Sequence, residues 1–290
     1  MRLATFNVLH GLPEDAEERH DVPAAVVARR LAEAVSALDA DVLALQELDR
    51  FQSRSGRTDQ AAIAARASGA RHWRYASAVH GDWPRATGRA ADPGLRVSGP
   101  DDARASELPS HGVALVTRLP VRLWRARRLR ASSVPFPLKV PGRSGLVLVR
   151  DQPRVALAAV LEGKHGPFTV VATHLSFVPG RNAAQLAAVH GWVADLPAPR
   201  ILLGDFNLTG PVPRWVLAAA ARLGGSDRPR GRQQAPWRDL SRLPTYPARR
   251  PLVRFDHVLA NGVPREAVRG TAAPRSEISD HRPLVVDVAL

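Results

Sequence analysis

The chain of 290 residues contains no cysteine. Disulfide bonds and thiolate metal sites are therefore excluded, and any bound metal must use oxygen or nitrogen ligands. Aromatic residues make up only 5% of the chain, which argues against a surface of stacked aromatic rings. No apolar run approaches the length of a membrane span, and polar Asn7 and His10 precede any stretch of signal-peptide length. We therefore expect a soluble, cytoplasmic protein with no stable membrane insertion.

Lysine is also scarce, because Lys139 and Lys164 are the only lysines among 41 basic residues. The remaining basic residues are arginines, and the chain carries a formal net charge of +14. A surplus of positive charge favours polyanionic partners such as nucleic acid, phosphoesters or acidic lipid. An arginine-rich composition also follows from codon usage in a GC-rich genome, so the charge alone gives modest support for nucleic acid.

Hydrophobic periodicity predicts a mixed α/β protein. Strands are predicted at 3–8, 41–45, 112–117, 121–129, 146–149, 155–161, 168–172, 201–204, 255–260 and 284–290. Helices are predicted at 23–38, 61–67, 181–193 and 215–223, with Thr58 or Asp59 capping the second and Gly224-Gly225 ending the last. Residues 81–109, 132–145 and 228–251 are predicted to form loops or connections. No domain linker is evident, so residues 1–290 are interpreted as one domain.

Polar clusters stand at the ends of these predicted strands. They are Asn7 with His10, Gln46-Glu47, Thr173-His174, Asp205-Phe206-Asn207, Asp256-His257 and Ser279-Asp280-His281. Each one alone is explained by a turn, a helix cap or a satisfied core histidine. Together they predict a pocket at one edge of the paired sheets. Carboxylates and carboxamides suit Mg²⁺ or Mn²⁺, and a cationic histidine beside the metal can neutralise charge on a phosphoryl group.

The same clusters resemble the motifs of the endonuclease/exonuclease/phosphatase superfamily, which includes DNase I-like nucleases. The resemblance rests on Thr5-Phe6-Asn7-Val8, Leu45-Gln46-Glu47, Ala172-Thr173-His174-Leu175, Leu203-Gly204-Asp205-Phe206-Asn207, Phe255-Asp256-His257-Val258 and Ser279-Asp280-His281-Arg282-Pro283-Leu284. These motifs occur in the family's order over nearly the whole chain. The resemblance implies a four-layer α/β/β/α sandwich with two packed mixed β-sheets.

The resemblance also implies roles for individual residues. Glu47 and Asn7 resemble the Mg²⁺ site, with Asp280 assisting. Asp205 resembles the base that activates water, and Asn207 the residue that holds the phosphate and that water. His281 and His174 resemble phosphate-contacting histidines, and Asp256 the carboxylate that supports His281.

A second set of residues is expected on the substrate side. His10 and His111 are candidates for phosphate contact, although His111 is also explained as a loop residue. Arg57, Asp59 and Gln60 resemble a short element of small bacterial members. Arg154 is interpreted equally well as a phosphate ligand or as a structural ion-pair residue.

Three alternative functions are compatible with the sequence. The first is a Mg²⁺-dependent phosphodiesterase, a nuclease acting on DNA or RNA. The second is a phospholipid or inositol-phosphate hydrolase of the same fold, ranked lower because residues 81–109 and 228–251 are polar and arginine-rich. The third is an inactive, basic nucleic-acid-binding module, against which the intact set of motif residues argues. A monomer is the default expectation.

Overall fold

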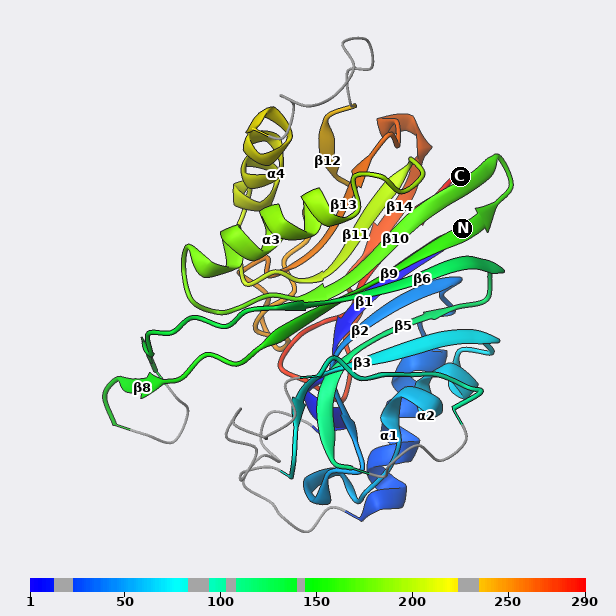
Figure 1. The fold of residues 1–290 in the computed structure, drawn as a ribbon. Coiled ribbons are helices and arrows are strands. Elements are labelled where there is room, and N and C mark those ends of the chain that lie inside the picture. The colour runs from blue at the N-terminus through cyan, green and yellow to red at the C-terminus, as the bar shows by residue number, and fades with distance from the viewer. Residues whose placement is uncertain (13–22, 83–93, 103–107, 140–143, 224–234) are drawn as a thin grey trace.

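A computed structural model describes residues 1–12, 23–82, 94–102, 108–139, 144–223 and 235–290. Two β-sheets pack face to face, and helices cover the outer face of each sheet (Figure 1). The layers are therefore α/β/β/α, which confirms the fold class predicted from the sequence.

The first sheet has seven strands and contains both the first and the last strand of the described chain. In spatial order they are β14 (Val268–Ala272), β15 (Leu284–Val288), β1 (Arg2–Asn7), β2 (Val42–Arg50), β5 (Ser110–Thr117), β3 (His72–His80) and β4 (Val97–Ser98). Strands β1 and β2 run parallel, and β15 pairs antiparallel to β1.

The second sheet has six strands. In spatial order they are β12 (Trp237–Asp239), β13 (Asp256–Asn261), β11 (Arg200–Asp205), β10 (Gly166–His174), β9 (Arg154–Gly163) and β6 (Val121–Leu129). Strands β10 and β11 run parallel and the other pairs are antiparallel. A separate two-stranded ribbon, β7 (Phe136–Leu138) with β8 (Val147–Val149), extends away from both sheets (Figure 1).

Two helices cover each sheet. Against the first sheet lie α1 (Ala24–Ser36) and α2 (Gln60–Ala67), and against the second lie α3 (Arg181–Trp192) and α4 (Val212–Leu223). Short 3₁₀ turns occur at Leu9–Gly11, Ser53–Ser55 and Arg265–Ala267. No helix in the described part of the chain is long and apolar enough to span a membrane.

The core lies in three apolar layers because side chains alternate across each strand. Leu3 of β1 and Leu157 of β9 both belong to the layer between the sheets. Phe6, on the other face of β1, packs with Leu31 of α1. Burial of such side chains is the main favourable term in folding, at about 25 cal/mol per Å² of apolar surface.

The predicted helices are all present, and the side chain of Asp59 caps α2 by accepting from the Ala62 amide at 3.1 Å. Helix α4 begins three residues before the predicted start at Trp215, because Pro213 is tolerated in a first helical turn. The predicted end of this helix at Gly224-Gly225 lies outside the described residues.

Five strands were not predicted. Strand β3 mixes small, polar and aromatic residues, and β14 is largely exposed, so neither shows a clear apolar alternation. Strands β4, β7 and β12 fall in segments predicted to be loops or connections, and each has only two or three residues. Pairing with a longer or a neighbouring strand stabilises such short segments, and that partner is invisible in the local sequence.

Gly204 allows β10 and β11 to approach closely just before the site. Its φ is 153°, and a Cβ there would lie 1.9 Å from the Thr173 carbonyl oxygen. We expect Gly204→Ala to destabilise the fold by about 1–3 kcal/mol or more, because backbone must move. Thermal unfolding measures the loss. The control is Gly191→Ala in α3, where a Cβ meets nothing within 4 Å and should stabilise by about 0.5–1 kcal/mol. Equal melting temperatures for the two variants would contradict the prediction.

Candidate active site

Strand ends from both sheets meet at one edge of the sandwich. Asn7 ends β1 and pairs with Gln46, whose neighbour Glu47 lies in β2. His174 and Asp205 end β10 and β11 as a registered pair, and Asp256 begins β13 opposite Asp205. A hydrogen bond links Asn7 of the first sheet with Asp205 of the second. The convergence inferred from the sequence is therefore present in the structure.

Local backbone geometry turns the Glu47 side chain toward this edge. The pairing of β2 with β5 is irregular between Leu45 and Leu48, and Glu47 in that irregularity has a φ of 58°. A bulge with a left-handed residue re-aims a side chain and costs free energy. Asn207 has a φ of 50° and shares this left-handed conformation. Such residues cluster where function constrains the backbone.

The amide of Asn7 joins two carboxylates. Its Nδ2 donates to Glu47 Oε1 at 3.0 Å and to Asp205 Oδ2 at 3.1 Å. Burial acts to raise the pKa of Glu47. Electrostatic attraction to His174, His111 and His10, together with the hydrogen bond from the Asn7 amide, outweighs burial and lowers the pKa of Glu47 to about 2. Glu47 is therefore ionised at neutral pH, and its side chain is 23% exposed.

Asp205 is the buried carboxylate at the centre of the site. Its Oδ1 accepts from the Asn207 backbone amide at 2.9 Å, and its Oδ2 lies 3.6 Å from His174 Nε2. Burial raises the pKa of Asp205 to about 6, although the nearby His281 imidazolium acts in the opposite direction. A carboxylate with a pKa near neutrality is suited to accept and release a proton.

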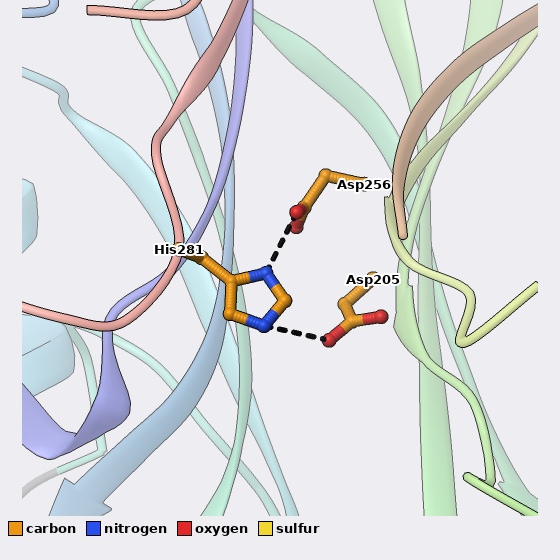
Figure 2. Close-up of side chains that lie close together, drawn as sticks. All are labelled: Asp205, Asp256 and His281. Carbon is orange, nitrogen blue, oxygen red and sulfur yellow. Dashed lines mark hydrogen bonds and ion pairs between the residues drawn. The ribbon is translucent and has the colours of Figure 1, made fainter. Parts of the chain in front are cut away.

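His281 lies between two carboxylates (Figure 2). Its Nδ1 is 2.7 Å from Asp256 Oδ2, and its Nε2 is 3.8 Å from Asp205 Oδ2. The hydroxyl of Thr245 donates to the same Asp256 oxygen at 2.6 Å. Burial alone would lower the pKa of His281, but the attraction of Asp256 and Asp205 raises it to about 10. His281 is therefore an imidazolium at neutral pH.

His174, unlike His281, is neutral at neutral pH. Its Nε2 lies 3.2 Å from Asn207 Nδ2, an amide nitrogen that can only donate, so this ring nitrogen accepts. Burial, together with the positive charge of Arg154, lowers the pKa of His174 well below its ordinary value. The two histidines consequently offer one neutral and one cationic ring on either side of Asp205.

Two groups in the site could hold a metal. Within the described residues, Asp205, Asp256 and His281 place one potential ligand atom each within 4.8 Å of one another. His281 is already protonated and bonded to Asp256, however, which leaves no lone pair at Nδ1 for a metal. Glu47 with Asn7 fits a divalent cation better. Glu47 is ionised and partly exposed, and the Asn7 amide nitrogen now lies within 3.1 Å of two carboxylate oxygens.

Asp280 is half-buried beside this region and contributes to the raised pKa of His281. Its Oδ1 accepts weakly from the Ser279 hydroxyl at 3.4 Å. No distance places it beside Glu47, so its predicted help in metal binding stays a prediction.

A charged network that sequence reasoning missed stands behind Glu47. Asp49 is fully buried, accepts two hydrogen bonds from Arg54 at 2.8 Å each, and lies 2.9 Å from His111 Nδ1. Burial acts to raise the pKa of Asp49, but His111 and Arg54 hold it well below its usual range. The sequence gives no clear signal for Asp49, because the irregularity of β2 between Leu45 and Leu48 breaks the strand alternation just before it. His10 is buried nearby, and burial and Arg54 lower its pKa to about 4.

The other predicted substrate contacts differ in their surroundings. Asp59 caps α2 and forms an ion pair with Arg50 at 2.9 Å. Gln60 is buried and bonds to the Asp49 amide and the His10 carbonyl. Arg57 is exposed in a left-handed turn. Arg154 lies within the electrostatic reach of Glu47 and Asp205, and burial lowers its pKa. The contacts of Asp59 and Gln60 are structural. Arg154 has an ion-pair partner in Asp151 at 4.0 Å, which fits its structural interpretation, and its predicted contact with phosphate stays a prediction.

The protonation of His281 gives a test of this geometry. We expect its imidazole ¹⁵N signals to titrate near pH 10 and Asp256→Asn to lower that midpoint. Because the folded pKa lies above the ordinary value of about 6.5, its stabilising contribution is complete below pH 6.5 and is lost as pH rises through 10. The control is Glu266→Gln, an exposed site. A wild-type midpoint near 6.5 would contradict the Asp256–His281 pair.

Comparison with known proteins agrees with this geometry. The model of the Endonuclease/Exonuclease/phosphatase family matches residues 4–281. No curated protein matches the chain. Among solved structures, a functionally unknown conserved protein from Enterococcus faecalis is similar with a TM-score of 0.61 and 16% identity, covering 100% of this chain and 99% of its own.

Two further similar structures belong to proteins with a name. A mannosyl-6-phosphatase from Bacteroides thetaiotaomicron has a TM-score of 0.57 and 17% identity, covering 100% of both chains. The human nocturnin catalytic domain with bound sulfate anion has a TM-score of 0.54 and 19% identity, covering 100% of this chain and 94% of its own. At these identities the likeness establishes the fold.

Proposed function

Because the chain belongs to the endonuclease/exonuclease/phosphatase family, we propose that it is a phosphodiesterase that requires a divalent metal and acts on DNA or RNA. Members of this family hydrolyse phosphoesters, so the reaction class follows from membership. The observation that carries the proposal is the position of Asp205. It is a buried carboxylate with a pKa near 6, held between neutral His174 and cationic His281.

Each residue of the site has its own role when water attacks phosphorus. Asp205 takes a proton from the attacking water as its oxygen bonds to phosphorus, and the backbone amide of Asn207 fixes the Asp205 carboxylate. The bond from phosphorus to the leaving oxygen breaks, and that oxygen takes up a proton from solvent. His281, held by Asp256 and Thr245, donates to a non-bridging phosphate oxygen and stabilises the charge that develops there. His174 and Asn207 hold the phosphate from the other side. Arg154 adds positive charge within reach of the same centre.

Glu47 would hold Mg²⁺ or Mn²⁺, with the carbonyl oxygen of Asn7 as a further ligand once its amide turns. Asn7 Oδ1 now accepts from the Leu9 amide at 3.2 Å, a long bond that a metal can replace. Bound there, the metal supplies Lewis-acid stabilisation of the phosphoryl oxygen. The buried Asp49–Arg54–His111 network fixes the strand that carries Glu47.

Nucleic acid is proposed as the substrate because of the net charge of +14. The sulfate anion bound by the human nocturnin catalytic domain supports anion binding by this fold. The mannosyl-6-phosphatase of Bacteroides thetaiotaomicron shows by its name that the fold also serves a sugar phosphate. We further propose that residues 1–290 act as one domain, as a monomer and in the cytoplasm.

One observation favours a second candidate, a phospholipid phosphodiesterase. The ribbon of β7 and β8 projects outside the sandwich (Figure 1). In and beside it, Val134 is 67% exposed and Leu146 and Leu148 are each 70% exposed. Exposed apolar residues grouped on a projecting ribbon suit contact with a lipid surface. The sequence analysis considered other loops for lipid contact, since it predicted residues 132–145 as a connection and only 146–149 as a strand.

A substrate panel tests the proposal. Purified protein is incubated with supercoiled plasmid, single-stranded oligonucleotide, bis-p-nitrophenyl phosphate, mannose 6-phosphate and phospholipid vesicles. Each reaction is run with Mg²⁺, Mn²⁺ or EDTA. We expect cleavage of nucleic acid that depends on the metal and stops in EDTA. Faster turnover of vesicle phospholipid would favour the second candidate. Plasmid binding without hydrolysis of any substrate would instead indicate an inactive binding module.

A further inference from the structure

A large cavity lies away from the site described above. It has a volume of about 750 Å³ and is bordered by α4, β12 and the start of β14. Trp237, on its wall, pairs with Asn261 at the end of β13, whereas Asp256 of the active site begins the same strand. Five residues of strand separate these points, about 17 Å. In Figure 1, β12 and α4 lie together at the top of the second sheet.

The cavity is lined by an excess of positive charge. Five arginines border it: Arg214, Arg222, Arg238, Arg242 and Arg265. All five are exposed. None forms a hydrogen bond or an ion pair through its side chain with the described part of the chain. Among the described residues that line the cavity, Asp239 is the one carboxylate, and Arg254 already binds it at 3.1 Å. Unpaired guanidinium groups around a concavity attract phosphate.

Two tryptophan side chains also border the cavity. Trp215 on α4 borders the cavity and is 59% exposed, while Trp237 forms part of the wall and is 4% exposed. An indole left in water forgoes the gain from burying its large apolar face. A planar ring that stacks on Trp215 would cover that face. The cavity volume lies within the range of about 300–1,000 Å³ that holds small ligands.

We propose that this cavity binds a nucleotide unit, with its phosphate on the arginines and its base on Trp215. The unit comes either from a free nucleotide or from a nucleic acid strand, since both present a phosphate beside an aromatic base. The site does not use Glu47, Asp205 or His281, so it binds without catalysis. In a complex with nucleic acid, the cavity would bind the strand at a distance from the bond that is hydrolysed.

The experiment measures binding in EDTA, where hydrolysis is stopped. A fluorescein-labelled single-stranded 12-mer is titrated with the full-length protein and followed by anisotropy, at several salt concentrations. Unlabelled AMP and inorganic phosphate are the competitors. The variants are Trp215→Ala and the double variant Arg214→Glu/Arg238→Glu. The matched control is Arg66→Glu/Arg71→Glu, which makes the same charge change at two exposed residues outside the cavity. Melting temperatures confirm that each variant is folded.

We expect Trp215→Ala to weaken binding roughly 5- to 150-fold, as for a lost base stack. The cavity double variant should weaken binding at least tenfold more than the control pair and reduce the salt slope by about one per lost phosphate contact. If AMP displaces the 12-mer, the cavity is a site for free nucleotides. If the 12-mer binds tightly and AMP does not displace it, the cavity is a site for a nucleic acid strand. Equal effects of the cavity and control pairs, or displacement by inorganic phosphate as strong as by AMP, would overturn the proposal. Neither result bears on catalysis, which the substrate panel measures separately.

Discussion

Replacing Asp205 with asparagine should lower kcat on the nucleic acid substrate by roughly 10²–10⁴-fold, the usual contribution of a positioned general base. The change is nearly isosteric, so Oδ1 can still accept the Asn207 amide hydrogen bond. What is lost is the basic oxygen beside His174 and His281. Single-turnover cleavage of a labelled oligonucleotide separates this loss from slower substrate binding.

Two controls accompany Asp205→Asn. Asp195→Asn removes an exposed carboxylate that pairs with Arg125 on the surface, and it should leave kcat unchanged. The melting temperature of Asp205→Asn should stay near or above that of the wild type, because a buried carboxylate whose pKa is raised is costly to keep charged. Turnover within threefold of wild type by a folded Asp205→Asn protein would remove Asp205 from the role of base.

Glu47→Gln should lower activity by roughly 10²–10³-fold, since a divalent metal contributes several kcal/mol to a phosphoryl transition state. Glutamine keeps the size of the side chain and can still accept from the Asn7 amide. It removes the ionised carboxylate that is the main proposed ligand. Binding of Mn²⁺, followed by electron paramagnetic resonance, should weaken in parallel with the activity, and excess Mn²⁺ should restore part of the rate.

The matched control is Glu33→Gln on the exposed face of α1, which should change neither Mn²⁺ affinity nor rate. Together the two measurements distinguish a metal ligand from a residue that only shapes the site. If Glu47→Gln retains wild-type Mn²⁺ affinity but loses activity, the metal is held elsewhere. The cluster of Asp205, Asp256 and His281 would then be the next candidate.

Periodicity predicted a mixed α/β protein with motif residues at strand ends, and the family resemblance supplied the four layers. Strand ends in parallel pairs lie at one edge, so Asn7 and Glu47, or His174 and Asp205, had to be neighbours once the strands were recognised. The contact between residues of the two sheets could not be predicted from strand positions. It depends on side chains such as Asn7 and Asp205, which are 198 residues apart, and only packing of the sandwich fixes their contact.

Other parts of the site escaped prediction because their signals are local and weak. Thr245 lies in a segment that looks like a loop, yet its hydroxyl orients Asp256. Asp49 and Arg54 look like ordinary surface charges in the sequence, and burial alone distinguishes them. The cavity beside α4 was equally hidden, since its arginines are spread from residue 214 to residue 265.

The position of β15 has a consequence for how the protein is made. The His281 imidazole comes from the segment directly before β15, a strand that lies beside β1, whereas its partner Asp256 belongs to the other sheet. A chain emerging from the ribosome in order therefore presents Glu47 and Asp205 long before His281. Only when residues 284–287 pair with residues 2–5 does the imidazolium reach its place. The proposed site is therefore completed late in folding, because His281 reaches Asp205 and Asp256 only after β15 has joined β1 in the first sheet.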